Sequence, residues 1–442
     1  MALLRAAFHT LGCKTNHYET DALRQQFSQA GFEIVPFDSF ADVYLINTCT
    51  VTGEADRKSR QMLRRTRKIN PEAIVVALGC LPALGDTKSC ADLSIGTAGK
   101  KQALEKVAAE LERRGLRLDN FRQNSGPLAD PASFEEFGSV DSQSETRAYV
   151  KIEDGCNNFC SYCAIPLARG RVRSRSRDNI LQETAALAAA GYKEIVLTGI
   201  HVCSYGSDQG LASHAVMELA LEMAEIDGIE RIRLGSLEPL SLTPAFIQLA
   251  SQNAKLLPHF HLSLQSGCDT VLARMNRHYR IREYREIVAS LRQHFNQPGL
   301  TTDVIVGFPG ETAAEHQASL DFCREIAFTR LHVFRFSPRA GTRAATLPDP
   351  VDPRTIANRS QAMLELADQL ALDYHQRQIG REQLVLLEKL RPDGFYEGYS
   401  PEYVPVRIKA EPGLHTGAIV RVTGVWADQE FMLCRNANGP GS

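Results

Sequence analysis

The central part of this chain is built around the stretch Cys156-Asn157-Asn158-Phe159-Cys160-Ser161-Tyr162-Cys163. Its three cysteines are spaced four and then three residues apart, so one loop can present three thiols to one inorganic group. Thiolates are the usual protein ligands of iron–sulfur clusters, and a cubane cluster has four irons. Three cysteines would therefore bind three irons and leave the fourth open to a substrate or a cofactor.

Zinc and a disulfide are the two alternatives for this motif. A structural zinc site usually has four protein ligands, and the nearest further candidates, His201 and Cys203, lie far along the chain. A disulfide would leave one of the three thiols unpaired. The spacing favours an iron–sulfur cluster over both alternatives.

The composition is that of an ordinary globular protein. The 442 residues, 43% of them hydrophobic and 23% charged, predict two to four domains. The net charge of −2 indicates no polyanionic partner, so any nucleic-acid surface must be local. No apolar run approaches the ~18 residues of a membrane span, and the N-terminus is too short for a signal peptide. We therefore expect a cytoplasmic protein with no membrane partner, whose eleven cysteines serve metal binding or catalysis rather than disulfides.

Residues 1–118 alternate strands and helices, which predicts a parallel sheet of the flavodoxin or Rossmann type. Strands are expected at 3–9, 43–46 and 73–78, and helices at 18–30 and 54–70. Cys13, Cys49 and Cys80 each follow one of these strands. Because the carboxyl ends of parallel strands share one edge, where ligands bind, we expect the three thiols to converge. The alternative is three ordinary buried thiols, which is our expectation for Cys90.

The expected helix at 54–70 carries an unusual number of cations. They are Arg57, Lys58, Arg60, Arg64, Arg65, Arg67 and Lys68. This pattern indicates a contact with a phosphate backbone. An ordinary solvated helix face is the alternative.

A polar segment at 119–145 predicts a linker, and after it the strand–helix alternation resumes. Six strands are expected, at 148–152, 194–198, 231–234, 260–264, 302–306 and 331–336. Six β/α units are too few for a full barrel, so residues 146–379 predict an open, partial (β/α)6 barrel of the TIM type. In such barrels the active residues gather where the strands end. Polar or glycine-rich segments do follow these strands, at 156–163, 198–201, 235–239, 265–267, 307–311 and 337–342.

The last part of the chain changes character. One long helix is expected at 353–379, followed by five short strands between 383 and 435. These strands predict a small antiparallel β-barrel over residues 380–437. Residues 438–442 read as a flexible tail.

With these residues in hand, the chain resembles the methylthiotransferase branch of the radical S-adenosylmethionine (SAM) enzymes over nearly its whole length. The resemblance rests on the motif at 156–163, on Cys13, Cys49 and Cys80, on the arginine-rich run at 169–175 and on Leu264-Gln265-Ser266-Gly267. The C-terminal segment is similar to the TRAM domain, an RNA-binding barrel. Residues 11–20 and 46–52 are similar to the subgroup that acts on N6-threonylcarbamoyladenosine in tRNA. One departure is Cys203, where this subgroup more often has glycine.

The resemblance implies two [4Fe–4S] clusters, one held by Cys156, Cys160 and Cys163 and one by Cys13, Cys49 and Cys80. The first would reduce SAM to a 5′-deoxyadenosyl radical, and the second would supply sulfur for a methylthio group at C2 of an adenine. The expected partners are the anticodon loop of a tRNA, a reducing electron donor and a sulfur source. Candidate cofactor-binding residues are Gly199, Glu238, Gln265, Arg171 and Arg173.

Three other interpretations remain open at this point. The same chemistry could serve isopentenyladenosine in tRNA or a ribosomal protein. The chain could also be an iron–sulfur RNA-binding or redox protein without catalysis. In the third interpretation, Cys13, Cys49 and Cys80 bind zinc.

Overall fold

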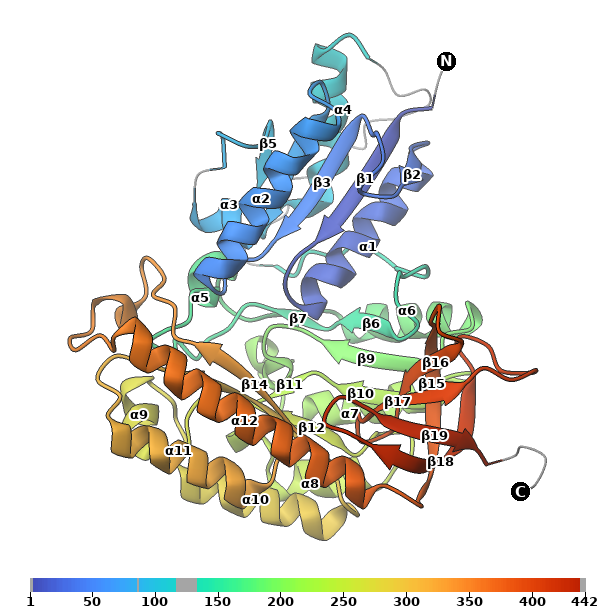
Figure 1. The fold of residues 1–442 in the computed structure, drawn as a ribbon. Coiled ribbons are helices and arrows are strands. Elements are labelled where there is room, and N and C mark those ends of the chain that lie inside the picture. The colour runs from blue at the N-terminus through green and yellow to red at the C-terminus, as the bar shows by residue number, and fades with distance from the viewer. Residues whose placement is uncertain (1–2, 86, 117–132, 438–442) are drawn as a thin grey trace.

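The computed structural model describes residues 3–85, 87–116 and 133–437. Residues 119–132 of the expected linker and the tail expected at 438–442 lie outside the described residues. Figure 1 shows the N-terminal sheet above the central strands, with the C-terminal barrel at one end of them. The strands of the N-terminal sheet point their carboxyl ends toward the central strands.

The N-terminal sheet has five parallel strands in the order β2-β1-β3-β4-β5. The strands are β1 (Arg5–Thr10), β2 (Glu33–Val35), β3 (Val43–Thr48), β4 (Ile74–Gly79) and β5 (Leu93–Ile95). The helices are α1 (Lys14–Gln29), α2 (Gly53–Ile69), α3 (Cys80–Leu84) and α4 (Ala103–Arg113). This order is that of flavodoxin-like folds, so the predicted class is confirmed. The sequence reading missed β2 and β5, which have only three residues each and so little periodicity to detect.

The central strands form an open parallel barrel, as predicted. They lie in two sheets, β10-β9-β6 and β11-β12-β13-β14, which an isolated bridge between Ile232 and Leu256 connects. The strands are β6 (Ala148–Lys151), β9 (Glu194–Thr198), β10 (Arg231–Leu234), β11 (Ser236–Leu237), β12 (His259–Leu262), β13 (Gly299–Val306) and β14 (Arg330–Arg335). Among the described residues no strand pairs β6 with β14, so the barrel stays open between them.

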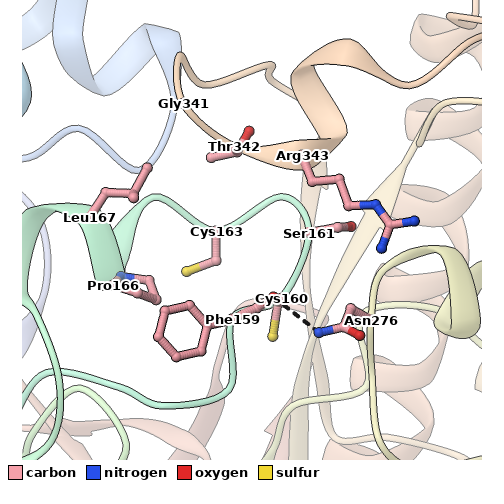
Figure 2. Close-up of a pocket in the computed structure, with 10 residues that line it drawn as sticks. All are labelled: Phe159, Cys160, Ser161, Cys163, Pro166, Leu167, Asn276, Gly341, Thr342 and Arg343. Carbon is pink, nitrogen blue, oxygen red and sulfur yellow. Dashed lines mark hydrogen bonds between the residues drawn. The ribbon is translucent and has the colours of Figure 1, made fainter.

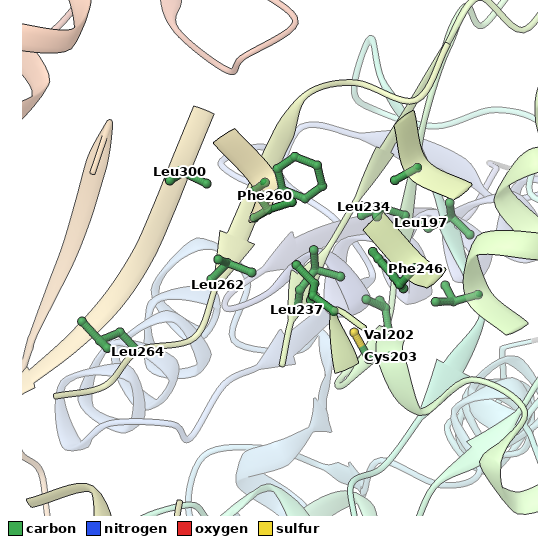
Figure 3. Close-up of a cluster of buried hydrophobic side chains, with 14 of the residues drawn as sticks. Leu197, Val202, Cys203, Leu234, Leu237, Phe246, Phe260, Leu262, Leu264 and Leu300 are labelled. Carbon is green, nitrogen blue, oxygen red and sulfur yellow. The ribbon is translucent and has the colours of Figure 1, made fainter. Parts of the chain in front are cut away.

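Alternation along the strands separates an apolar outer face from a polar inner face. On the outer face, Leu197, Leu234 and Leu262 are buried in the main hydrophobic core (Figure 3). The helices that surround the strands are α6 (Arg177–Ala189), α7 (Ala215–Ala224), α8 (Pro244–Ser251), α10 (Ile281–His294), α11 (Ala313–Ile326) and α12 (Pro353–Arg377). On the inner face, the neighbouring positions hold polar side chains such as Glu194 and Arg233.

Helix α1 of the N-terminal domain covers part of this inner face. Tyr18 and Ala22 of α1 share a buried cluster with Tyr149 of β6 and Val196 of β9. The Tyr18 hydroxyl donates to the Glu183 carboxylate at 3.2 Å. The N-terminal domain therefore covers the inner face of β6 and β9.

The C-terminal strands form a closed five-stranded barrel in the order β15-β16-β17-β19-β18. The strands are β15 (Glu382–Leu390), β16 (Phe395–Tyr399), β17 (Pro405–Lys409), β18 (Ile419–Ala427) and β19 (Met432–Asn436). Four of the five pairings are antiparallel, as expected, but β17 and β19 run parallel. The reason is that β18 crosses over to pair with β15, and the hairpin from β18 brings β19 back beside β17. No helix among the described residues has the length and apolar character that a membrane crossing requires.

Candidate functional site

The cysteine loop follows β6 and the short strand β7 (Glu153–Asp154). Phe159 adopts a left-handed conformation with φ of 47°, and the Cys163 N–H donates to the Cys160 carbonyl at 3.0 Å. Burial, with the charges of neighbouring cysteines, raises the pKa of Cys156 to about 11 and that of Cys163 to about 12. These thiols need a cationic partner to ionise at neutral pH, and iron supplies one.

A cavity of about 260 Å³ opens beside this loop (Figure 2). Phe159, Cys160 and Cys163 line it on one side, and Gly341 and Thr342 on the other. Figure 2 shows the Cys160 and Cys163 sulfur atoms near the Phe159 ring. The loop therefore presents its thiols next to open space.

Arg277 is a site residue that the sequence reading missed. One guanidinium nitrogen donates to the Cys160 sulfur at 3.2 Å, and the other donates to the Glu238 carboxylate at 2.7 Å. Its signal in the sequence was the group of arginines at 274, 277 and 280, which follows the predicted strand end at 265–267. Arg277 fixes the Glu238 carboxylate relative to the cysteine loop, and Arg277 with His201 holds the pKa of Glu238 below its usual value despite burial.

Gly199 and Gln265 occupy the ends of β9 and β12, as predicted. A Cβ atom on Gly199 would overlap the Glu153 carboxyl group, so a larger residue there would displace that side chain. Burial raises the pKa of Glu153 to about 8. Gln265 has φ of 64° and pairs with β13, its N–H donating to the Asp303 carbonyl at 2.8 Å. Both residues shape the rim above the inner face of the barrel.

The second cysteine triad lies where β1, β3 and β4 end. These strands are neighbours in the sheet, so their ends bring Cys13, Cys49 and Cys80 together. Cys13 is exposed, whereas Cys49 and Cys80 are buried. Burial, together with the charges of Cys80 and Cys13, raises the pKa of Cys49 to about 11. The structure therefore places the three cysteines at one edge of the sheet, where neighbouring strands end.

The glycine that precedes two of these cysteines has a steric role. Gly12 has φ of 107°, and a Cβ atom there would lie 2.8 Å from the Cys49 Cβ. Gly79 has φ of 93°, and its Cβ would lie 2.6 Å from the Asn47 side-chain oxygen. Both positions combine left-handed backbone with close approach to the next strand, so only glycine fits.

A buried ionic group connects the two triads. Its members are Glu19, Lys100, Lys151, Asp154 and Arg169. Arg169 ends α5 (Ile165–Arg169), just after the cysteine loop, and donates to Glu19 and Asp154 at 3.0 Å and to the Asn16 side-chain oxygen at 2.7 Å. Burial alone would lower the pKa of Arg169, but Asp154, Glu19, Cys80 and Cys13 raise it well above its usual value. One guanidinium thus lies between the cysteine loop and the second triad.

The arginine-rich run does not form a single binding surface. Arg169 and Arg175 are buried in ion pairs, so neither can contact RNA. Arg173 donates to the Arg169 carbonyl at 2.8 Å. Arg171 is exposed and lies over the Phe159 ring, with 4.8 Å between the guanidinium carbon and the ring centre. Arg177, also exposed, pairs with Glu222.

The other features predicted from the sequence are two further cysteines and the cations of helix α2. Cys90 and Cys203 are buried, and Cys203 belongs to the main hydrophobic core. On α2, four of the seven cations are ion-paired: Arg57 and Lys58 with Glu54, Arg65 with Asp38, and Arg67 with Asp92. Helix α2 therefore carries less free positive charge than its sequence indicates.

The donor groups fit two iron–sulfur clusters. Each triad offers three thiols, and each lies beside an arginine that can stabilise their negative charge. In the described part of the chain, no three His, Cys, Asp or Glu side chains converge as the ligands of one metal ion do. A cubane cluster places its three ligands on three different irons, so it requires no such convergence.

Comparison with known proteins gives matches over most of the chain. Residues 5–93 match the model "Uncharacterized protein family UPF0004", and residues 150–323 match the radical SAM superfamily. The chain is 37% identical over 431 residues to the threonylcarbamoyladenosine tRNA methylthiotransferase MtaB of Bacillus subtilis, covering 94% of this chain and 92% of the relative. It is 32% identical to the tRNA-2-methylthio-N(6)-dimethylallyladenosine synthase of Pelotomaculum thermopropionicum, covering 93% of each chain.

Among solved structures, the fold is similar to the radical SAM methyltransferase TsrM from Kitasatospora setae, solved with cobalamin and a [4Fe-4S] cluster. The TM-score is 0.56 at 15% identity, over 78% of this chain and 77% of the other. At this identity the likeness concerns the fold alone.

Proposed function

Since the chain belongs to the radical SAM methylthiotransferase family, we propose that it adds a methylthio group to C2 of N6-threonylcarbamoyladenosine at position 37 of tRNA. The observation that carries the proposal is the pair of cysteine triads, one on each of two parallel sheets, with Arg169 between them. Similarity supports the choice of nucleoside, because identity is 37% to the threonylcarbamoyladenosine enzyme and 32% to the dimethylallyladenosine enzyme.

The enzyme uses iron–sulfur and SAM chemistry, and we assign one cluster to each triad. When bound, these groups supply a 5′-deoxyadenosyl radical, a transferable sulfur atom and a methyl group. Cys156, Cys160 and Cys163 would hold the cluster that binds SAM. Cys13, Cys49 and Cys80 would hold the sulfur-supplying cluster. A reducing electron donor and a sulfur source are required partners.

The surrounding residues position these groups and exclude water. Arg277 donates to Cys160 and Glu238, so it keeps the Glu238 carboxylate at a fixed place beside the SAM-binding loop. We assign the SAM ribose hydroxyls to Glu238. We assign Gly199 and Gln265, at the rim of the barrel, to the cofactor pocket. We assign the SAM carboxylate to Arg173, whose guanidinium lies 3.7 Å from Asp154, just before the cysteine loop. Arg171, stacked on Phe159, remains exposed for a phosphate.

The tRNA would be held by two surfaces. The C-terminal barrel exposes Trp426, which lies beside Phe431, and Arg407 covers that ring at 4.0 Å. Aromatic rings and guanidinium groups are what unpaired bases stack on. The exposed Arg64 and Lys68 of α2 would contact the backbone. The target base must leave the loop stack to reach the site between the triads.

The test is anaerobic reconstitution followed by nucleoside mass analysis of tRNA that carries threonylcarbamoyladenosine. We expect about eight irons per chain, from two four-iron clusters, and the 2-methylthio nucleoside as product. A product only from tRNA with isopentenyladenosine would move the assignment to the other subgroup. No cleavage of SAM under reduction would overturn the enzymatic function itself.

A further inference from the structure

The inner face of the central barrel forms a polar chamber beneath the two triads. His259 and His261 of β12, Asp303 of β13 and His332 of β14 project into it from aligned positions. The His261 and His332 ring centres are 5.8 Å apart, and the His261 Nε2 lies 3.4 Å from the Asp303 carboxylate. We call these four side chains, with Arg233 and Tyr403, the inner chamber.

A loop of the C-terminal barrel forms the floor of the inner chamber. Tyr403 has φ of 71° and stacks on His259, with 4.7 Å between ring centres. The Arg233 guanidinium lies over the Tyr403 ring, with 4.7 Å between the guanidinium carbon and the ring centre. It donates to the Pro401 carbonyl at 3.0 Å. The floor is therefore ordered and polar, and it carries positive charge.

Lys14 extends into the inner chamber from the N-terminal domain. It lies one turn before Tyr18 in α1, so the two side chains share a face of the helix. Tyr18 is fully buried against Tyr149 and Val196 on the inner face of the barrel. The groups within electrostatic range of the Lys14 ammonium are Tyr403, Arg147, Arg233, Glu194 and His332.

The acidic side chains around the inner chamber already have partners within the chain. Glu194 is shared by Arg231 and Arg233, each at 2.9 Å. Glu388 pairs with Arg147, and Asp303 lies beside His261. Among the described residues, no carboxylate forms an ion pair with Lys14. A half-buried ammonium without an acid partner favours an anion supplied from outside the chain.

We propose that Lys14 binds the threonyl carboxylate of the substrate nucleoside and thereby selects it over nucleosides with an uncharged N6 substituent. The proposal rests on the proposed function, because threonylcarbamoyladenosine carries a free carboxylate whereas isopentenyladenosine carries an apolar group. Lys14 directly follows Cys13, so a base presented to the second triad has its substituent next to this ammonium. His332 and Tyr403 also line a cavity of about 710 Å³ between β14, α12 and the C-terminal barrel, so this end of the chamber is not tightly packed.

The experiment measures binding by the reconstituted full chain with fluorescent anticodon stem-loops. One carries threonylcarbamoyladenosine, a second carries the same nucleoside with the carboxylate converted to a carboxamide, and a third carries isopentenyladenosine. The wild type is expected to bind the first about ten- to a hundredfold more tightly than the second, the usual effect of losing a charged hydrogen bond. Lys14→Met is expected to bind the first two alike, and Lys14→Arg to keep the preference.

Controls separate this role from damage to the site. Lys106→Met on the exposed face of α4 keeps the preference of the wild type. Iron content and the electron paramagnetic resonance signals of Lys14→Met should match the wild type. Equal weakening of the acid and carboxamide stem-loops by Lys14→Met would indicate a phosphate contact or a structural role, and would overturn the proposal.

Failure of the proposed function has a different outcome. If the wild type forms no methylthio product on the first stem-loop, the function is wrong. If it forms that product but binds the acid and the carboxamide alike, the function stands and the role of Lys14 is wrong.

Discussion

The two cysteine triads differ in how the chain builds them. Eight consecutive residues place Cys156, Cys160 and Cys163, so local sequence positions all three thiols. Cys13, Cys49 and Cys80 meet only because β1, β3 and β4 are neighbours in a folded sheet. The first triad is therefore a property of a loop, and the second is a property of a topology. A substitution that disturbs the fold should therefore disrupt the second triad before the first.

The largest expected difference between the triads is in the reaction itself. Cys160→Ala should reduce 5′-deoxyadenosine formation from SAM to background, because the loop then has two thiols for its cluster. Cys49→Ala should still cleave SAM but form no methylthio product. Chromatography of 5′-deoxyadenosine beside nucleoside mass analysis checks both. Loss of SAM cleavage in Cys49→Ala would show that the triads do not act separately.

The second largest effect concerns the connection between the triads. Arg169→Met leaves Glu19 and Asp154 without their shared guanidinium, and breaking a buried ion pair costs about 3–5 kcal/mol of unfolding free energy. Denaturant unfolding measures this loss. Iron at the second triad should fall as well, because Arg169 also holds Asn16 beside Cys13.

Arg175→Met is the matched control. Arg175 is equally buried and pairs with Glu183 and Glu136, away from both triads. It should lose similar stability but keep its iron. If both variants lose iron to the same extent, Arg169 acts through general stability and not through the second triad.

Sequence reading succeeded where the pattern was local and failed where partners were distant. The motif at 156–163 and the six central strands follow from spacing and alternation, and these elements formed where expected. The buried role of Arg169 depends on Glu19, which is 150 residues away, so the local sequence could not indicate it. The contact between Arg277 and Cys160, 117 residues apart, was hidden for the same reason.

Neither triad's setting could be read from composition alone. The parallel pairing of β17 and β19 depends on a crossover that no local signal marks. In contrast, Gly12-Cys13 and Gly79-Cys80 did carry a usable signal. A glycine before a cysteine at a strand end is typical of a tight turn, and the structure adds a second reason, which is the close approach of the next strand.

A smaller effect tests that close approach. Gly12→Ala would place a Cβ 2.8 Å from the Cys49 Cβ in left-handed backbone, which costs about 1–3 kcal/mol. Gly191→Ala has a similar φ of 91° but meets nothing within 4 Å. Iron analysis and thermal unfolding should show that Gly12→Ala loses iron at the second triad, whereas Gly191→Ala only loses stability. Normal iron content in Gly12→Ala would mean that the β1 end can relax away from Cys49.

The smallest expected effect concerns whether RNA binds near the second triad. Helix α2 follows Cys49 closely, and Arg64 and Lys68 are its exposed cations with no ion pair to an acid in the described residues. Replacing both with glutamine should reduce the slope of log binding constant against log salt by about one to two, since each phosphate contact contributes about 0.7–0.9. Arg282→Gln on the outer helix α10 should leave the slope unchanged. An unchanged slope in the α2 variant would indicate that RNA binds through the C-terminal barrel. Helix α2 would then have no part in bringing the substrate to the second triad.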